Sequence, residues 1–488
     1  MLEKLKALEH LSRQLDPGED TRRQLLKAAQ NYSETFLAGL PENGTYSKDL
    51  GRKGLGSSPF EESPTEFSKI LDQFRAEVDT TGITPCSGGQ MGYIPGGGLY
   101  PSALGDFLAD ISNRYSGVAF AGPGAAAMEL TLVEWMCRLV GYPASASGDL
   151  TSGGSMATLS ALVTARDACG IDYARIPASC VYLTEQAHHC IGKALHVAGL
   201  KDVHQRIVSM DTRYRMDTAH LKRTIEADRA QGLEPWLVIA SAGTTDTGAI
   251  DPIRDIATVA RQEGLWFHLD AATGGFFLLC EPGREQLQGI ELADSIVMDP
   301  HKGLSLPYGS GAVLVRDRKF LLQSNAYDAN YMQDAKQDGA THEHPLSPAD
   351  LSLELTRPFR GPRMWFPLRL FGLKVFRASI EEKVWLARYF YQEISKVDGF
   401  ETGPYPDLSI VTYRYLPQTG DANLFNKRLL EAVLEDGKLF ISSTTINGNY
   451  TLRLAVLNFR THRQHIDYLL ALLKRTVAEL ESRQTGEL

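Results

Sequence analysis

Lys302 stands in the motif Asp299-Pro300-His301-Lys302-Gly303, directly after the apolar residues 293–298. A lysine beside a buried strand usually packs its carbon stem and extends its ammonium to water. The alternative is chemical, because a desolvated ammonium loses its proton more readily and the neutral amine forms Schiff bases with carbonyl groups. The rest of the chain has to decide between these two interpretations.

Other residues that could do chemistry also stand at the ends of segments with the composition of buried strands. Ligands of open parallel sheets bind beyond the carboxyl ends of the strands, so these ends are the first place to look for a site. Asp270 and Lys302 are separated by about one strand–helix–strand unit, which can bring both to one edge of a sheet. They could equally form a plain ion pair. The candidates at strand ends are His188, Thr245, Asp270, Ala272, His301 and Lys302.

The residues Gly153, Gly154 and Ser155 open a predicted helix. Their backbone N–H groups and the serine hydroxyl suit a phosphate at the positive end of that helix, although glycines before a helix are more often plain turn residues. A molecule with a phosphate, an aldehyde and a basic ring nitrogen would use all of these groups, and pyridoxal phosphate is such a molecule. In this hypothesis Lys302 binds the aldehyde, Asp270 keeps the ring nitrogen protonated and His188 stacks on the ring.

The elements that would position these residues alternate between strand and helix from about residue 150 to 316. Apolar strands are predicted at 179–184, 206–210, 236–241, 265–270 and 294–299, and helices at 155–169, 218–232 and 251–264. This alternation predicts an α/β fold with a mostly parallel central sheet wrapped by helices. A helix over 370–397, a strand at 409–416 and a hairpin turning at Asn447-Gly448 predict a small C-terminal α+β domain.

The predicted domains are an N-terminal helical segment over 1–85, a large α/β domain over 86–370 and a small domain over 371–488. Within the first segment, Ser63 is expected to cap a helix, with Pro64 at its first position and Glu66 closing a capping box.

The composition argues against several other classes of protein. The chain of 488 residues has a net charge of −9, which disfavours binding to nucleic acid or to an anionic membrane. No apolar run approaches the length of a membrane helix, and the first residues lack the apolar core of a signal peptide. The 6 cysteines include no CxxC pair, which fits a reducing, cytoplasmic location. His188, His189 and Cys190 lack ligand spacing, so no metal is expected.

Several motifs together carry a family resemblance that extends from about residue 60 to 475. They are "YIPGGGLYPSALGDFLADISN", "TSGGSMATL", "EQAHHC", "AGTTDTGAID", "HLDAATGG", "DPHKG", "RPFRGPRMWFPLRLFG" and "YTLRLAVLNFRTH". In this order and spacing they resemble the group II pyridoxal-phosphate decarboxylases, which include aromatic-amino-acid, glutamate and diaminobutyrate decarboxylases. The resemblance implies the aspartate-aminotransferase-like fold type I and a homodimer with active sites at the subunit interface, on which the N-terminal segment would pack.

The resemblance also implies roles for individual residues. Lys302 matches the Schiff-base lysine, Asp270 the partner of the ring nitrogen and His188 the stacking imidazole. Thr245 and Ala272 match residues that line the cofactor, and Gly154, Ser155 and His301 match positions on the phosphate side. Tyr331 matches the tyrosine of a mobile loop that protonates the α-carbon after CO2 has left, although it could instead be a surface aromatic.

The sequence departs from the family pattern at positions that bear on the substrate. Gly303 and Thr273 replace aromatic residues that are common in the family, and we expect these changes to enlarge or repolarise the pocket. Tyr93 and Trp365 offer apolar surface for an aromatic side chain, although each could be packing instead. The sequence therefore predicts α-decarboxylation of an L-amino acid, with an aromatic substrate slightly favoured. An aminotransferase or an aromatic aldehyde synthase on the same fold is the alternative.

Overall fold

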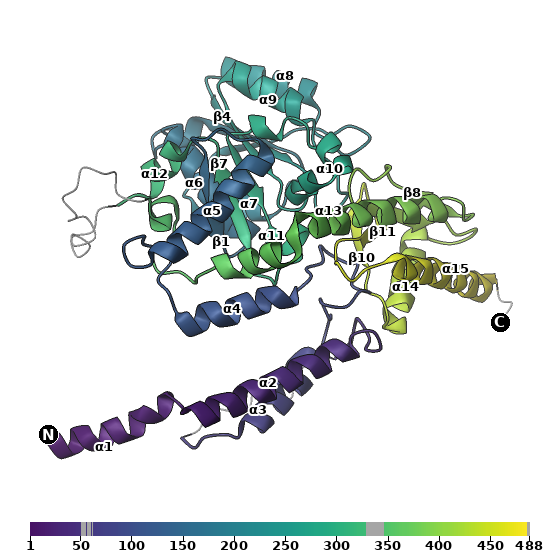
Figure 1. The fold of residues 1–488 in the computed structure, drawn as a ribbon. Helices are drawn as coiled ribbons and strands as arrows, with labels where there is room; N and C mark the ends of the chain where they lie inside the picture. The colour runs from purple at the N-terminus through teal and green to yellow at the C-terminus, as the bar shows by residue number, and fades with distance from the viewer. Residues whose placement is uncertain (50–54, 56–59, 61, 328–345, 486–488) are drawn as a thin grey trace.

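The computed structural model describes the chain except at residues 50–54, 56–59, 61, 328–345 and 486–488 (Figure 1). Its strands form a seven-stranded sheet of order β1-β7-β6-β5-β4-β2-β3 and a four-stranded sheet of order β10-β11-β9-β8. The strands of the large sheet are β1 (Ser147–Thr151), β2 (Ser179–Leu183), β3 (His204–Ile207), β4 (Glu234–Ser241), β5 (Trp266–Asp270), β6 (Ser295–Met298) and β7 (Gly311–Val315).

The central sheet is mostly parallel, as predicted. β6, β5, β4, β2 and β3 pair in parallel, whereas β7 is antiparallel to both β6 and β1. The five strands predicted from apolar runs are confirmed within a few residues. β1 was not predicted, because its sequence Ser-Gly-Asp-Leu-Thr has neither alternation nor β-branched residues before its last position. It is a fully buried strand only because β7 and the helices around it cover it.

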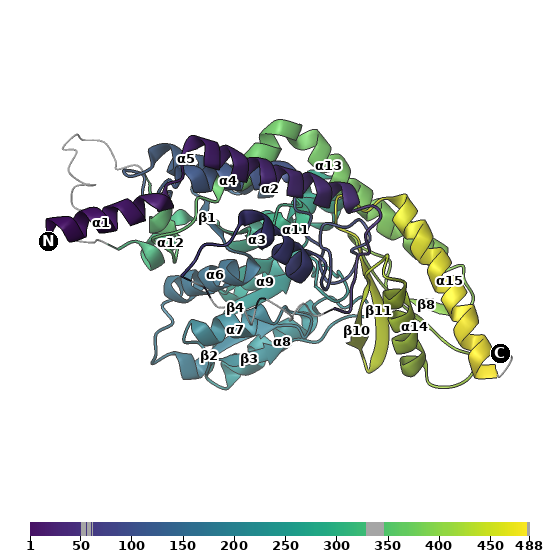
Figure 2. The ribbon, with the colours of Figure 1, turned by 90° about the horizontal axis from the view of Figure 1, so that it is seen from below.

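Helices cover both faces of this sheet (Figures 1 and 2). One core is built from strand side chains together with α5, α8 and α9, and the core on the other face uses α6, α7 and α12. In α9 the residues Ile253, Ile256, Ala257 and Ala260 are all buried, which confirms the predicted apolar stripe. The helices are α4 (Tyr100–Ser112), α5 (Pro123–Val140), α6 (Gly154–Ala168), α7 (Cys190–Val197), α8 (Thr218–Ala230), α9 (Ile253–Glu263), α10 (Glu281–Gln286), α11 (Pro300–Gly303) and α12 (Arg318–Asn325).

The small sheet lies at one end of the molecule beside α14 and α15 (Figure 2). Its β10–β11 hairpin turns at Asn447 and Gly448, whose φ angles of 51° and 79° suit the turn predicted there. Its elements are β8 (Phe400–Thr402), β9 (Ile410–Tyr415), α14 (Ala422–Asp436), β10 (Ser442–Ile446), β11 (Asn449–Ala455) and α15 (Arg463–Thr485).

The helix predicted over 370–397 begins earlier than expected. α13 (Gly361–Ile394) starts at Gly361 and is interrupted at Gly372, whose φ of 69° is not helical. The first part packs against α4, and the second reaches the small domain and α15. Gly372 permits this change of direction because it lacks a Cβ. The break lies next to the boundary predicted between residues 370 and 371.

The N-terminal helices run along the outside of the molecule (Figure 1). α1 (Leu2–Ser12), α2 (Glu19–Gly39) and α3 (Phe67–Phe74) contain no buried residue in this single chain. The predicted capping box is wrong, because α3 begins at Phe67 with Glu66 as its N-cap and Ser63 lies outside the helix. Among the described residues, no helix combines the length and the apolarity that crossing a membrane requires.

Candidate active site

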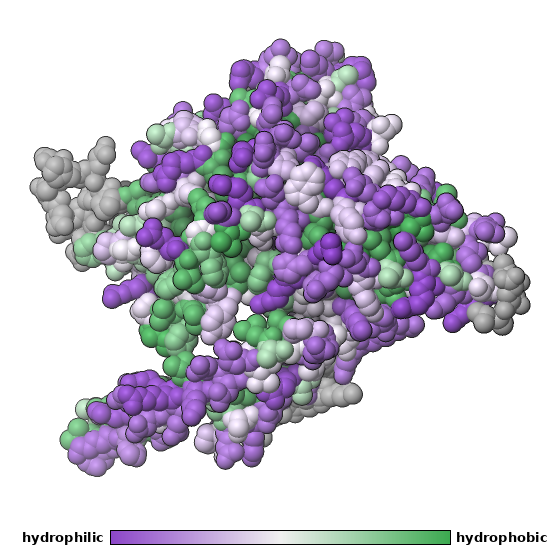
Figure 3. All heavy atoms as spheres, turned by 45° about the vertical axis from the view of Figure 1, so that its right-hand side comes forward, coloured by the Kyte–Doolittle hydropathy of each residue, from purple (hydrophilic) through white to green (hydrophobic). Residues whose placement is uncertain are grey.

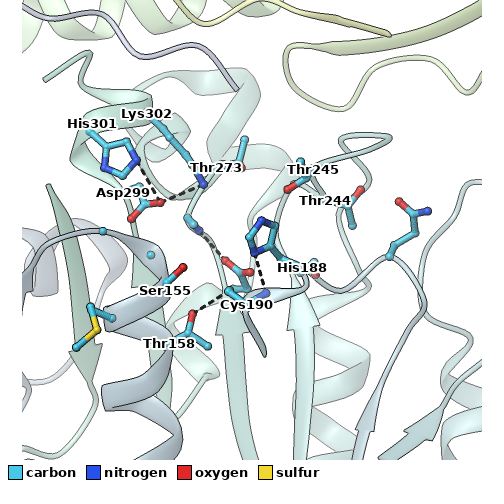
Figure 4. A pocket seen from close by; sticks show the side chains of 18 of the residues that line it. Ser155, Thr158, His188, Cys190, Thr244, Thr245, Thr273, Asp299, His301 and Lys302 are labelled. Atoms are coloured by element: carbon cyan, nitrogen blue, oxygen red, sulfur yellow. Dashed lines mark hydrogen bonds and ion pairs between the residues drawn. The ribbon is translucent and has the colours of Figure 1, made fainter. Parts of the chain in front are cut away.

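A cavity of about 330 Å³ opens at the carboxyl ends of β4, β5 and β6, between them and the start of α6 (Figure 4). The elements that supply its lining come from distant parts of the sequence. It brings together most of the residues that the sequence predicts, namely Gly154, Ser155, His188, Thr245, Asp270, Ala272, His301 and Lys302. The structure thus places these side chains and backbone groups around one space.

The start of α6 forms one wall of the cavity. Gly153, the N-cap, has φ of 145°, a backbone conformation that favours glycine. A Cβ at Gly311 would stand 2.5 Å from the Gly153 backbone, so β7 packs directly against this turn. A Cβ at Gly154 would come within 2.8 Å of Asp299 Oδ2. The wall therefore presents bare backbone and the Ser155 hydroxyl, with the free N–H groups of a helix start.

Lys302 lies in the single turn α11, directly after β6. Its Nζ is 3.0 Å from Asp299 Oδ2, and the Asp299 side chain is only 2% exposed. The ion pair that the sequence left open between Lys302 and Asp270 is therefore made with Asp299 instead. Figure 4 shows the lysine reaching the cavity beside Asp299 and Thr273.

His301 lies beside Asp299 at the edge of the cavity (Figure 4). Its Nδ1 donates to the Ser310 carbonyl oxygen, and its Nε2 stands 3.7 Å from Asp299 Oδ2. Burial lowers the pKa of His301. Nδ1 carries a proton, because its partner is a carbonyl oxygen, which can only accept.

His188 follows β2 and faces the cavity (Figure 4). Its Nδ1 accepts a hydrogen bond from the Cys190 backbone N–H at 3.2 Å, which leaves the ring proton on Nε2. Burial lowers the pKa of His188, and the Asp270 carboxylate opposes this effect. Burial also raises the pKa of the Cys190 thiol to about 11, so it is not a thiolate near neutral pH.

Asp270 ends β5, and its carboxylate is oriented by its own backbone. Oδ1 accepts from the Ala272 N–H at 3.1 Å. Thr244 and Thr245 come from the turn after β4, where Thr244 Oγ1 is 2.8 Å from Thr247 Oγ1. This turn and Ala272 close the side of the cavity opposite α6.

Two described residues that were predicted near the substrate, Tyr93 and Trp365, do not line this cavity. Tyr93 is 61% exposed, and its ring contacts Phe440 at 5.4 Å between centroids, because Arg453 Nη1 holds the Tyr93 carbonyl at 2.6 Å. Trp365 packs on the core of the large domain, next to Phe366. Tyr331 lies outside the described residues.

Thr273 and Gly303, the two residues that depart from the family pattern, border different cavities. Thr273 lines the cavity, as expected. Gly303 does not, because it packs against Phe276, whose Cβ would lie 2.6 Å from a Cβ at this position. It borders a separate hollow of about 570 Å³ together with Phe371, Phe376 and other apolar residues.

Sequence reasoning missed other parts of the lining. Ser241, Gln186, Cys190, Thr158 and Asp299 all border the cavity. Gln186 and Asp299 lie inside the motifs "EQAHHC" and "DPHKG", but the sequence does not indicate whether their side chains point into the cavity. The register of β2 and the single turn of α11 decide this, and neither has a sequence signal of its own.

The lining fits pyridoxal phosphate by its own chemistry. It offers an amine at Lys302, a carboxylate at Asp270, a flat neutral ring at His188 and a glycine-lined helix start that a Cβ would fill. Two buried oxygen atoms, Gln186 Oε1 and Asp299 Oδ1, have no hydrogen-bond partner in the described part of the protein. Among the described residues no group of histidine, cysteine and acidic side chains could hold a metal ion.

Comparison with known proteins identifies the family. The model of the pyridoxal-dependent decarboxylase conserved domain matches residues 53–416. An aromatic-L-amino-acid decarboxylase of Bacillus atrophaeus is 34% identical over 80% of this chain and 81% of its own length, and a phenylacetaldehyde synthase of Arabidopsis thaliana is 27% identical over 83% and 84%. A crystal structure of Oryza sativa TDC with PLP and tryptamine matches with a TM-score of 0.88 and 26% identity, covering 96% of this chain and 99% of that chain. The chain therefore belongs to the pyridoxal-dependent decarboxylase family and is an amino acid decarboxylase that uses pyridoxal 5′-phosphate.

Proposed function

We propose that the cavity between α6 and the ends of β4 to β6 is the decarboxylation site and that it acts on an aromatic L-amino acid. The observation that carries this proposal is the convergence of Lys302, Asp270 and His188 on one space beside a bare helix start. Relatives named for aromatic amino acids support the substrate class, among them the Bacillus atrophaeus decarboxylase and tryptophan decarboxylases of rice.

Each lining residue has a distinct part in this proposal. Lys302 Nζ holds the aldehyde carbon, and Gly154, Ser155 and His301 surround the phosphate. Asp270 keeps a proton on the ring nitrogen, where its charge favours the protonated form. His188 covers one face of the ring as a neutral imidazole, and Thr245 and Ala272 border it.

When bound, pyridoxal phosphate supplies an electron sink for the α-carbon as CO2 leaves. The residues supply orientation and protons. Asp299 Oδ2 stands 3.0 Å from Lys302 Nζ and holds this amine at the wall of the cavity. The poorly solvated cavity favours loss of the substrate carboxylate, and Tyr331 is proposed to return a proton to the α-carbon.

A second candidate is an aldehyde synthase, because a phenylacetaldehyde synthase is among the relatives. Tyr331 separates the two. As the proton donor to the α-carbon, it would direct the reaction to the amine. Tyr331→Phe should then divert flux toward oxidative deamination, in which dissolved O2 is the oxidant and is reduced to H2O2, so the products to measure are aldehyde, ammonia and H2O2. Unchanged amine yield would remove this role from the tyrosine.

The proposed assembly is a cytoplasmic homodimer with active sites at the subunit interface. The support for the homodimer is the apolar surface that the single chain exposes on α4 and α13, together with helices α1 to α3, which contain no buried residue within the chain. Tyr93 is proposed to reach substrate in this assembly, where the interface surrounds the site.

The experiment that tests the substrate is a panel of the twenty amino acids with diaminobutyrate, scored for CO2 and for amine without added keto acid. Tryptophan, tyrosine and phenylalanine are expected to release CO2 with equimolar amine. Turnover of glutamate or diaminobutyrate in their place would contradict the aromatic assignment. Amino transfer that depends on a keto acid would contradict the amine-forming reaction.

A further inference from the structure

Asp299 is the one side chain of the described cavity lining that has a buried carboxylate with an oxygen atom lacking a hydrogen-bond partner. It is 2% exposed, and its Oδ1 has no hydrogen-bond partner among the described residues. A Cβ at Gly154 would stand 2.8 Å from Oδ2 and 3.2 Å from Oδ1, so both oxygens face the first residue of α6. The carboxyl group therefore borders the place where the helix start would receive a phosphate.

The charges around the start of α6 do not favour the binding of a phosphate beside Asp299. The described lining carries the carboxylates of Asp270 and Asp299 against the single ammonium of Lys302, and it contains no arginine. A helix start contributes roughly half a positive charge. A phosphate dianion would thus stand beside the Asp299 carboxylate, whose Oδ2 is paired with Lys302 but whose Oδ1 has no partner among the described residues, and like charges repel strongly at a buried position.

The other titratable groups around Asp299 do not supply the missing hydrogen. Lys302 Nζ is engaged with Oδ2 at 3.0 Å. His301 Nε2 lies 3.7 Å from the same oxygen, which is longer than a hydrogen bond, and His301 Nδ1 is engaged with the Ser310 carbonyl oxygen. His188, Cys190 and Asp270 border the same cavity on the side of β2 and β5. None of them is hydrogen-bonded to Oδ1.

We propose that Asp299 binds the phosphate of the cofactor as a neutral carboxylic acid, so that cofactor binding takes up one proton at Asp299. The proton comes from solvent, forms an O–H bond on Oδ1 and is donated to a phosphate oxygen. Two acceptors that face each other then share a hydrogen bond where they would otherwise repel. This inference rests on the proposed position of the phosphate at α6.

Binding of pyridoxine 5′-phosphate to the apoprotein tests it without activity. This ligand has the phosphate but no aldehyde, so no bond to Lys302 forms. Isothermal titration at pH 8 in two buffers of different ionisation enthalpy counts the protons taken up. Wild type should take up about one proton more than Asp299→Asn. For each unit by which pH rises, the affinity of wild type should therefore fall by about tenfold more than the affinity of the variant. The amide cannot titrate but can still donate to phosphate.

Asp270→Asn is the matched control, because it removes the other carboxylate of the cavity. When this variant binds the ligand, it should no longer take up the proton that Asp270 stabilises on the ring nitrogen. It should still take up the proton that binds to Asp299. Equal proton counts in wild type and Asp299→Asn would overturn the proposal, and so would a wild type that takes up no proton, whatever the variants do. A ligand that binds without this uptake overturns only the role of Asp299. A ligand that fails to bind wild type at all overturns the proposed site as well.

Discussion

His188 is held as a flat, neutral ring at the edge of the cavity. Its Nδ1 is occupied by the Cys190 N–H, and burial lowers its pKa. Its proposed contribution is contact with the face of the cofactor ring, and aromatic pairs contribute about 1 kcal/mol. We predict that His188→Ala weakens cofactor binding about tenfold and that His188→Phe restores most of it. Equilibrium dialysis of the apoproteins checks this, and an alanine variant with unchanged affinity would contradict it.

His268 gives a prediction about stability and pH. It is fully buried on β5, where Nδ1 contacts Ser295 Oγ at 2.8 Å, and burial lowers its pKa to about 4. The unfolded chain binds a proton to this residue near its ordinary pKa of about 6.5, so its contribution to stability is full above that pH and is lost as pH falls toward 4.

The expected size of this effect is about 2 kcal/mol between pH 7.5 and pH 5. Urea unfolding of wild type and His268→Asn at both pH values measures it. Asp251, whose pKa burial raises to about 6, acts in the opposite direction in both proteins, so only the difference between them is informative. The variant should lose less stability than wild type on acidification. Parallel losses would show that His268 titrates normally.

Residue chemistry could be predicted from the sequence where it depends on residue type and strand order. Lys302, Asp270 and His188 were predicted because each stands at or after the end of an apolar run, and the parallel sheet does bring them together. The partner of Lys302 was not predictable. Asp270 and Asp299 have the same chemistry, and only the tight turn of α11 places Asp299 at 3.0 Å from Nζ. The path of Tyr93 depends on Arg453, a contact between residues 360 positions apart.

At the scale of elements, the contact between β7 and the start of α6 shapes the cavity. A Cβ at Gly311 would stand 2.5 Å from the Gly153 backbone, and neither strand nor helix start can yield easily. Overpacking of this kind costs about 1–3 kcal/mol. We predict that Gly311→Ala weakens cofactor binding by tenfold or more because it displaces the turn that receives the phosphate.

Gly192→Ala is the matched control for this prediction. Gly192 lies exposed in α7, and nothing stands within 4 Å of a Cβ there. Alanine favours a helix by about 1 kcal/mol over glycine, so this variant should unfold at slightly higher urea and bind the cofactor as wild type does. Fluorescence titration with pyridoxal phosphate compares the two. Equal affinities in both variants would mean that the α6 turn tolerates displacement.

Elements with a strong period were predictable, and those defined by their neighbours were not. The stripe of α9 and the Asn447-Gly448 turn follow from local sequence. β1 is short and polar and becomes a strand only by pairing with β7. The early start of α13 and its break at Gly372 serve packing on α4 and on the small domain, which the local sequence does not encode.

At the scale of the whole molecule, one surface is more apolar than a single soluble chain usually presents. Hydrophobic side chains gather beside the N-terminal helices (Figure 3). On α4, Phe107 is 46% and Ile111 72% exposed, and on α13 Leu370 is 66% exposed. Contiguous exposure of this kind marks an interaction surface. It agrees with the proposed homodimer, in which a second copy covers α4 and α13.

Light scattering coupled to size exclusion tests this assembly. Wild type should show twice the chain mass of 53.8 kDa, and Phe107→Glu combined with Ile111→Glu should shift it toward the monomer and lower activity at least tenfold. Tyr173→Glu is the control, because Tyr173 is 87% exposed and lies far from α4 in the sequence. A wild type that is monomeric at micromolar concentration would contradict the proposed interface.

The central claim is that Lys302 carries the cofactor, and reductive trapping tests it most directly. The purified holoprotein is treated with sodium borohydride, digested and analysed by mass spectrometry, with Lys383 as an internal comparison because it is a lysine that is 1% exposed and lies outside the cavity. The phosphopyridoxyl group is predicted on the peptide that contains Lys302 and on no other. Its presence on a different lysine, or its absence from a protein that decarboxylates normally, would contradict the account.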